Sequence, residues 1–306
     1  MMGGAGPDSA GGWGRGSAVI LRFKRIAAPF VTAAIVASAG VGLGSCTSAF
    51  YDKNTIPRTG VVQEPTIRTM ARLNMDRAAP VLIHIYKEES TLEVWKQDRT
   101  GRFALLKTYP ICKFSGTLGP KIATGDRQAP EGFYDVTPDQ MNPTSTEYLS
   151  FNTGFPNAFD RSLGRTGGFL MVHGGCSSSG CYAMTDQGIE EIYGLVDEAF
   201  KGGQDKVQLA ALPFRMTDQN LARHAVDPNA PFWTMLKTGS DAFHATGRPP
   251  TVAVCDRRYV FNPAAAADDL DPNSPCPPGI DQTRPVLQAA SSKMQTRRAA
   301  ATAGGM

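Results

Sequence analysis

Short apolar runs separated by turn residues dominate the chain between positions 81 and 172. The runs Val81-Leu82-Ile83-His84-Ile85-Tyr86 and Leu92-Glu93-Val94-Trp95 predict two strands, which the polar residues 87–91 join into a hairpin. Further strands are predicted at 103–112, 133–136, 147–151 and 168–172, with Gly- and Pro-rich clusters between them. This pattern favours a β-rich sheet domain.

Helical periodicity begins only after position 185. From Ile189, apolar residues recur at 192, 193, 196 and 199, which is the spacing of one helix face. Thr185 or Asp186 can cap the start of this helix, and Gly202 can end it. A second periodic stretch carries Phe232, Met235, Leu236 and Phe243. The predicted fold class is therefore α+β, mostly β with accessory helices.

The first 45 residues have the pattern of an export signal. A basic patch that contains Arg22 precedes an apolar run from Ile26 to Gly44, and the run ends in Leu43-Gly44-Ser45-Cys46. A Cys directly after Leu-Gly-Ser resembles a lipobox, so we expect Cys46 to be lipidated and to become the new N-terminus. The alternatives are a plain signal peptide and an uncleaved transmembrane anchor, which Pro29 disfavours.

All three interpretations export the domain that follows. Thr47 rather than Asp follows the cysteine, which favours the outer membrane in a diderm bacterium. The predicted location is therefore the cell envelope: the periplasm, with a lipid anchor in the outer membrane. Residues 46–78 are polar and irregular, and we expect them to be a tether between membrane and domain.

Composition and charge narrow the class of protein. The chain has 306 residues, of which 42% are hydrophobic and 19% charged, as in an ordinary globular protein. Its net charge of +3 comes from the N-terminal segment, because residues 46–306 hold 27 basic and 27 acidic side chains. This balance excludes a nucleic-acid-binding footprint. After Phe261 the chain is rich in Ala, Pro and Asp, which predicts a disordered tail over 262–306.

Five cysteines remain besides Cys46: Cys112, Cys176, Cys181, Cys255 and Cys276. An exported protein occupies an oxidising compartment, so we expect at most two disulfides and one free thiol. Cys255 and Cys276 are plausible partners because both lie in a Pro-rich region. Three alternatives remain for Cys112 and Cys176. They could form a second disulfide with each other, they could be two inert buried thiols, or one of them could be a redox partner of Cys181.

The loop Val172-His-Gly-Gly-Cys-Ser-Ser-Ser-Gly-Cys-Tyr182 follows a predicted strand and precedes a predicted helix. Its small residues let a substrate backbone approach and leave N–H groups free for a developing oxyanion. The start of the helix near Thr185 would favour a thiolate. The chemistry that fits is acyl transfer by a cysteine that a histidine activates.

The spacing of the His and Cys residues in this loop is also compatible with three other interpretations. His173, Cys176 and Cys181 could be ligands of a structural zinc ion, but zinc needs a fourth ligand and usually two closely spaced pairs. A disulfide within the loop and a tight turn without chemistry are the remaining alternatives.

The loop resembles the catalytic signature of the L,D-transpeptidase catalytic domain family (YkuD-type), and it is especially similar to the YafK-like murein L,D-transpeptidase branch. The resemblance covers about Pro80 to Phe261 and implies the family's β-sandwich and an L,D-transpeptidase-like catalytic domain over 79–261. It extends to Ser115-Gly116-x-x-Gly119-Pro120-Lys121, Gly125-Asp126-x-x-x-Pro130-Glu131-Gly132-x-Tyr134, Phe151-Asn152-x-Gly154-Phe155-Pro156-Asn157, Pro213-Phe214-Arg215-Met216 and Phe232-Trp233-x-x-Leu236-Lys237.

The resemblance also assigns roles by position. Cys181 would be the nucleophile and His173 the general base, with the carbonyl oxygen of Gly174 orienting the imidazole. The backbone N–H groups of Gly180 and Cys181 would form the oxyanion hole. Substrate contacts are expected from Ser178, Ser179, Tyr182 and Arg215.

The chain departs from the family pattern at two places. Ser179 replaces the usual His before Gly-Cys, and Ala183-Met184 stand where many members have an Arg or Asn. That Arg is thought to bind a substrate carboxylate in the family. Arg215 and Lys121 are the candidates to replace it here, but the preferred prediction for both is a charged side chain on the protein surface.

The implied reaction is attack of Cys181 on diaminopimelate in a peptidoglycan stem peptide through a thioester, without metal or cofactor. One alternative is a hydrolase that uses the same site to release a wall-attached lipoprotein or a D-amino acid. Another is a non-catalytic lipoprotein that binds peptidoglycan. The expected partners are peptidoglycan stem peptides and the membrane that holds the lipid anchor. If the protein is a hydrolase, a wall-attached lipoprotein is a further expected partner.

Overall fold

The computed structural model describes residues 56–263 and 269–280. The predicted export signal, its alternatives and the lipidation site Cys46 therefore lie outside the described residues. Within the described part, no helix is both long and apolar enough to cross a membrane.

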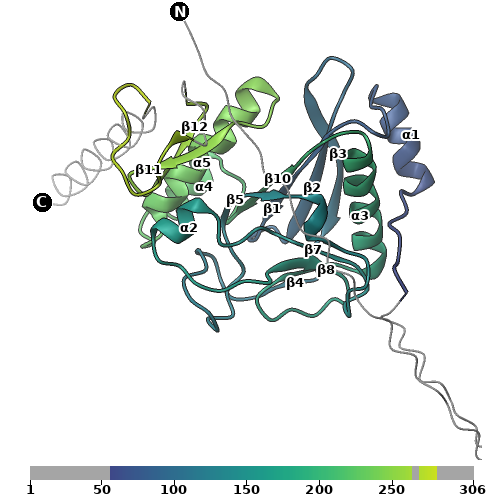
Figure 1. The fold of residues 1–306 in the computed structure, drawn as a ribbon, viewed down its shortest axis with the longest axis horizontal. Helices are drawn as coiled ribbons and strands as arrows, with labels where there is room; N and C mark the ends of the chain where they lie inside the picture. Colours follow the sequence, from purple (N-terminus) through teal and green to yellow (C-terminus); the bar gives the residue numbers. More distant parts are fainter. Residues whose placement is uncertain (1–55, 264–268, 281–306) are drawn as a thin grey trace, which may run out of the picture. The chain divides into compact units, whose positions relative to one another are not determined.

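Two five-stranded sheets form the framework of this region (Figure 1). The first sheet has the order β3-β2-β1-β10-β5, and the second has the order β4-β9-β8-β7-β6. Their strands are β1 (Val81–Tyr86), β2 (Thr91–Gln97), β3 (Phe103–Pro110), β4 (Lys113–Phe114), β5 (Gly132–Val136), β6 (Met141–Asn142), β7 (Ser150–Asn152), β8 (Met171–His173), β9 (Tyr182–Ala183) and β10 (Val207–Leu212). A separate hairpin joins β11 (Val252–Cys255) and β12 (Arg258–Phe261).

Alternation along the strands builds one core on each face of the first sheet. On β1, Ile83 and Ile85 pack in a core that also includes Phe151 and Val172 of the second sheet. Tyr86 belongs to the core on the opposite face. All six residues of β1 are buried, as expected for a strand covered on both faces. The shared core confirms the α+β fold and its two packed sheets.

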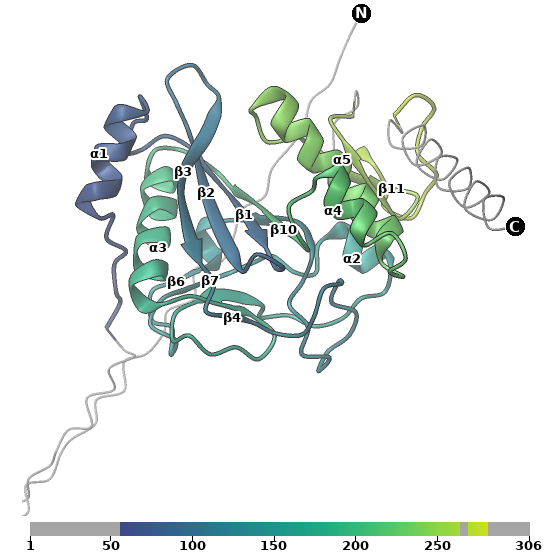
Figure 2. The same ribbon diagram turned by 180° about the vertical axis from the view of Figure 1, so that it is seen from behind.

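Helices cover the two sides of this framework. α1 (Glu64–Arg72) and α3 (Asp186–Lys201) lie side by side, whereas α4 (Asp218–Arg223), α5 (Ala230–Thr246) and the β11–β12 hairpin lie on the opposite side (Figures 1 and 2). The short helix α2 (Ala158–Ser162) and a 3-10 turn, η1 (Pro138–Gln140), complete the elements. The predicted limits of α3 are confirmed, because Thr185 caps its start and Gly202 its end.

The tether prediction needs correction over its second half. Residues 64–72 form α1, and the hydroxyl of Thr66 donates to the carboxylate of Glu191 on α3. Just before α1, Gly60 packs so closely on Gly194 that a side chain at either position would meet backbone atoms. This segment is therefore part of the folded domain.

The tail prediction is also wrong for part of its range. Ile280 is 8% exposed and packs with Val260 and Cys255, and the sulfur of Cys276 is bonded to that of Cys255. Residues 269–280 are therefore attached to the β11–β12 hairpin. The rest of the predicted tail beyond Ile280 lies outside the described residues.

His84 lies in the core on β1. It is 3% exposed, packs against the rings of Trp95 and Phe243, and its Nδ1 lies 3.3 Å from the hydroxyl oxygen of Tyr86. Burial lowers the pKa of His84 to about 3, so the imidazole is neutral at physiological pH.

Candidate active site

The candidate site is built on two adjacent parallel strands of the second sheet. Val172 of β8 pairs with Tyr182 of β9, and both side chains are fully buried on the core face. Successive side chains of a strand point to opposite faces. By this rule His173, which follows Val172, and Cys181, which precedes Tyr182, lie on the other face of the sheet, where the sulfur contacts the backbone of Met171, two residues before His173. We call residues 174–181, which connect the two strands, the catalytic loop.

A backbone carbonyl fixes the imidazole of His173. The Nδ1 atom lies 2.7 Å from the carbonyl oxygen of Gly174, and the side chain is 6% exposed. A carbonyl oxygen only accepts, so Nδ1 must carry the proton, and in the neutral ring Nε2 is then free to accept one. The contact expected for Gly174 is present.

The sulfur of Cys181 lies between two backbone groups. The N–H of Met171 donates to Sγ at 3.3 Å, and the thiol lies 3.8 Å from the carbonyl oxygen of Phe169. Burial is the main cause that raises the pKa of Cys181, and the charge of Glu147 acts in the same direction, whereas the Met171 N–H and Lys121 lower it. The raised pKa favours the protonated thiol form of Cys181 at neutral pH.

Two serine hydroxyls hold the catalytic loop and occupy the backbone N–H groups that were predicted to form the oxyanion hole. The N–H of Gly180 donates to Ser115 Oγ at 2.6 Å, and the N–H of Cys181 donates to Ser178 Oγ at 3.0 Å. Ser178 donates its single hydroxyl proton to the carbonyl oxygen of Cys181, so Ser115 must be the donor in the 2.8 Å bond between the two hydroxyls. In this conformation, neither predicted oxyanion donor is free for a substrate.

A disulfide ties the other end of the catalytic loop to the framework. Cys176 is bonded to Cys112, which directly precedes β4. Cys176 therefore has no thiolate to offer a zinc ion, and the described residues contain no group of three or more potential metal-ligating side chains. The disulfide contradicts the zinc reading of the loop. Of the cysteines in the described residues, Cys181 is the one that is not paired.

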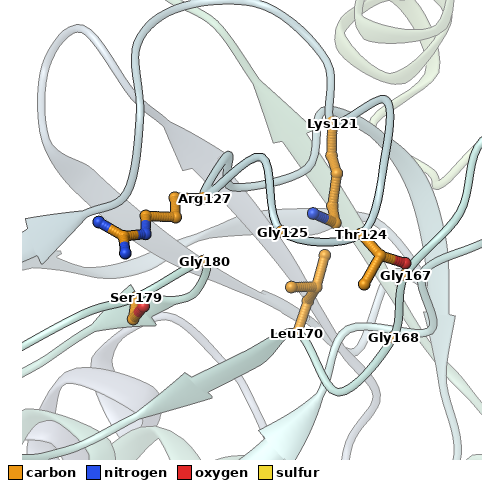
Figure 3. A pocket seen from close by; sticks show the side chains of 9 residues that line it. All are labelled: Lys121, Thr124, Gly125, Arg127, Gly167, Gly168, Leu170, Ser179 and Gly180. Carbon is orange, nitrogen blue, oxygen red and sulfur yellow. The ribbon is translucent and has the colours of Figure 1, made fainter.

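A pocket of about 350 Å³ opens at Ser179 and Gly180 of the catalytic loop (Figure 3). Leu170, which lines it, lies between the two residues whose backbone contacts the sulfur, and Gly180, which also lines it, directly precedes Cys181. The full lining comprises Lys121, Thr124, Gly125 and Arg127 from the β4–β5 loop, Gly167, Gly168 and Leu170 from the segment before β8, and Ser179 and Gly180 from the catalytic loop.

The structure separates the residues that were expected to contact substrate. Ser179 is exposed and lines the pocket, whereas Ser178 holds the loop through its hydrogen bonds. Tyr182 is completely buried, and its hydroxyl donates to the carbonyl oxygen of Pro130, so it cannot contact a substrate. Arg215 lies over the ring of Tyr86 on the first sheet and pairs with Glu93, so it does not belong to this site.

Lys121 and Asp126 form an ion pair at the edge of the pocket. Lys121 is 4% exposed, which contradicts its reading as a surface charge. Asp126 accepts hydrogen bonds from the N–H groups of Ile122, Ala123 and Gln128, so it fixes a turn.

Sequence reasoning missed two features of the site. The Met171 N–H contact with the sulfur depends on strand register, which no local pattern encodes. Arg127, on the turn of Asp126, was passed over, although its charge beside a Gly-rich turn was a usable signal.

Comparison with known proteins adds sequence relatives. A model of the L,D-transpeptidase catalytic domain family matches residues 80–209. Two Escherichia coli proteins, from strain K12 and from O157:H7, both carry the description "Putative L,D-transpeptidase YafK". Each is 47% identical to this chain over 194 residues, which is 63% of the chain and 78% of the relative.

Solved structures give weaker similarities. A mutant of the helical cell shape determining protein Pgp2 from Campylobacter jejuni aligns with a TM-score of 0.37 at 20% identity, over 57% of this chain and 64% of that one. Bd1075 from Bdellovibrio bacteriovorus aligns with a TM-score of 0.33 at 15% identity, over 62% of this chain and 88% of that one. Similarities at this level support no conclusion about the site.

Proposed function

Because this chain belongs to the L,D-transpeptidase catalytic domain family, we propose that it is a cysteine acyltransferase that acts on diaminopimelate-containing stem peptides of peptidoglycan. The observation that carries the proposal is the pair on β8 and β9. A free thiol and a histidine whose Nε2 is available lie on the same face of the sheet, next to a pocket. A thiol and a base in this arrangement are what nucleophilic acyl transfer requires.

The proposed reaction begins with proton transfer from the thiol. His173 Nε2 takes the proton as Sγ of Cys181 attacks the carbonyl carbon at the L-centre of diaminopimelate. The C–N bond to the terminal D-Ala then breaks, the imidazolium returns the proton to the leaving amine, and a thioester remains. An incoming amine forms a cross-link or a protein attachment, whereas water releases the acid. No step uses a metal or an organic cofactor.

The burial of the thiol supports this order of events. A sulfur whose pKa is raised by burial keeps its proton until a base removes it during attack. His173 is then required as a general base, and a permanent thiolate–imidazolium pair is not part of the resting state.

The test is incubation of the purified protein with disaccharide–tetrapeptide fragments, followed by mass spectrometry. We expect cross-linked dimers together with released D-Ala, and no product with Cys181→Ala because no other group can form the thioester. Ser177→Ala is the matched control in the same loop and should keep wild-type turnover. Product formation by Cys181→Ala would overturn the mechanism.

The same experiment separates the alternative functions. D-Ala release without dimers means that water is the acceptor and identifies a hydrolase. Absence of any product, both from these fragments and from wall fragments that carry a covalently attached lipoprotein, identifies a binding protein without activity if the fragments still bind.

We further propose that the protein works in the cell envelope as a lipoprotein anchored in the outer membrane through Cys46. The support is the basic, apolar and Leu-Gly-Ser-Cys sequence of the N-terminal segment. Metabolic labelling with palmitate should mark the wild type and not Cys46→Ala, and equal labelling of both would refute the anchor.

A further inference from the structure

The pocket beside Cys181 carries positive charge and no negative charge in its lining. Of the nine residues around it, Lys121 and Arg127 are cationic and none is acidic. A pocket of one sign next to a nucleophile favours substrates that bring the opposite charge.

Of the two cationic side chains, only that of Lys121 has a carboxylate partner within the part of the chain that the structure describes. The Lys121 ammonium is buried and donates to Asp126 and to the carbonyl oxygen of Ala123. Arg127 is exposed, and no described residue gives its guanidinium a hydrogen bond or an ion pair. Arg127 therefore supplies the available charge of the pocket.

The backbone holds Arg127 in a costly conformation. Its φ is +54°, in the left-handed region that side chains with a Cβ rarely adopt. The carboxylate of Asp126 fixes the turn around it by accepting three backbone N–H groups, from Ile122, Ala123 and Gln128. Strain of this kind persists where the surrounding contacts determine the conformation. The turn therefore fixes the direction in which the side chain of Arg127 leaves the backbone on the pocket wall.

The residues that directly follow Cys181 in the sequence offer no cation. Ala183 and Met184, which follow Cys181 by two and three residues, are uncharged and completely buried. A carboxylate that enters with an acyl group at the sulfur therefore finds its counter-charge on the β4–β5 loop.

We propose that this pocket binds a free carboxylate of the acyl donor and that Arg127 is the specificity-determining residue that pairs with it. The inference rests on the proposed function and names its substrate class: a peptide whose residue at the scissile carbonyl carries an unamidated carboxylate at the far end of its side chain. A guanidinium is suited to this task because its planar fork matches a carboxylate with two parallel hydrogen bonds. The position of Leu170 and Gly180, beside the sulfur, puts such a group within reach when its carbonyl lies at Sγ.

The test compares two donors that differ only at this carboxylate, one with the free acid and one with the carboxamide. For the wild type, kcat/KM should favour the acid by about tenfold or more, since a charge-assisted bond to Arg127 is lost with the amide. In Arg127→Gln the preference should vanish through a higher KM for the acid, while the amide is used as before. Arg127→Lys should retain part of the preference, and the exposed Arg68 provides the matched control, Arg68→Gln.

Binding measurements test the carboxylate pocket independently of whether the protein catalyses the proposed reaction. Calorimetric titration of the two donors into Cys181→Ala, with and without Arg127→Gln, requires no turnover. Weaker binding of the acid alone in the double variant supports the carboxylate pocket, even if no product forms with the wild type. Unchanged affinity for the acid in the double variant, or an unchanged acid-to-amide ratio in the kinetics, overturns the inference while leaving the proposed nucleophile untouched.

Discussion

At the residue scale, the ionisation of Cys181 is decided by its surroundings. The sequence suggested that the start of α3 would favour a thiolate, but burial outweighs this effect and raises the pKa of the thiol above its usual value of 9.0. The charge of Glu147 adds to the increase, and Asp186 brings a further negative charge to the first turn of the helix. Whether a thiol is buried cannot be read from neighbouring residues in sequence, so this property required the fold.

The raised pKa predicts slow alkylation at neutral pH. Thiolate is the reactive form, so the rate of modification by iodoacetamide should rise with pH and reach half its maximum above pH 9.0. Glu147→Gln removes a charge that opposes ionisation, and it should lower the midpoint and speed modification at any fixed pH below it. Mass spectrometry of the Cys181 peptide measures both rates.

The matched control for this measurement is Glu64→Gln. It removes the same charge from α1, where the carboxylate of Glu64 is exposed in its pair with Arg68 and is not among the groups that shift the pKa of Cys181. The control should leave the midpoint unchanged. A wild-type midpoint below pH 9.0 would contradict the protonated resting state.

At the element scale, the buried pair of Lys87 and Glu131 holds the loop that forms the pocket wall. Both side chains are fully buried, and the ammonium also donates to the carbonyl oxygens of Gly119 and Ala129. The carboxylate of Glu131 accepts the N–H of Gly119 and the indole N–H of Trp233 on α5. The β4–β5 loop, which presents Arg127, is thus attached both to α5 and to the residue that follows β1.

Removing one member of this pair should be costly. Lys87→Met leaves the Glu131 carboxylate buried without its counter-charge, and we expect it to lower the free energy of unfolding by about 3–5 kcal/mol. Lys201→Met is the control, because Lys201 is 73% exposed in its pair with Asp197 and should change nothing measurable. Urea unfolding of the three proteins measures the difference, and equal stability of both variants would contradict this account.

The elements that the sequence predicted are those with strong local patterns. β1, β2 and α3 follow apolar periodicity, and their positions are confirmed. β10 was missed although it pairs with β1 at the centre of the first sheet, because its short apolar run is ambiguous without its neighbours. α1 was missed because only Thr66 and Met70 are buried on it, which is too weak an apolar pattern to predict a helix, and part of its attachment is the polar contact from Thr66 to Glu191.

In the candidate site too, residues within one local segment were predicted, whereas contacts between distant segments were not. His173, Gly174 and Cys181 follow from one short segment, and the contact between the first two is present. The hydrogen bond from Gly180 to Ser115 joins residues 65 positions apart, and Ser115 also bonds to Ser178, which accepts the N–H of Cys181. The occupied N–H groups could therefore not be foreseen from local sequence.

At the scale of the whole described domain, two disulfides join segments that are distant in sequence. Cys112 and Cys176 are 64 residues apart, and Cys255 and Cys276 are 21 apart. Closing such loops restricts the unfolded chain, which on the chain-entropy model stabilises the fold by about 4 and about 3 kcal/mol respectively. The first bridge reaches the catalytic loop, whereas the second attaches residues 269–280 to the β11–β12 hairpin.

The two bridges should therefore differ in their effect on turnover. Replacing Cys112 and Cys176 together by serine should lower both the free energy of unfolding and kcat, because the catalytic loop loses its covalent tie. The matched pair of replacements at Cys255 and Cys276 should lower stability and leave kcat near the wild-type value. Urea unfolding and fragment turnover measure the two effects, and a larger loss of kcat in the second variant would contradict the assignment.

The bridge at Cys176 also has a consequence for how the protein matures. Only four residues separate this cysteine from Cys181, so a newly made chain can join the wrong two sulfurs during oxidative folding. Such a molecule would be complete in sequence yet would have no nucleophile. The yield of correctly bridged protein therefore depends on the thiol–disulfide exchange that joins Cys176 to Cys112.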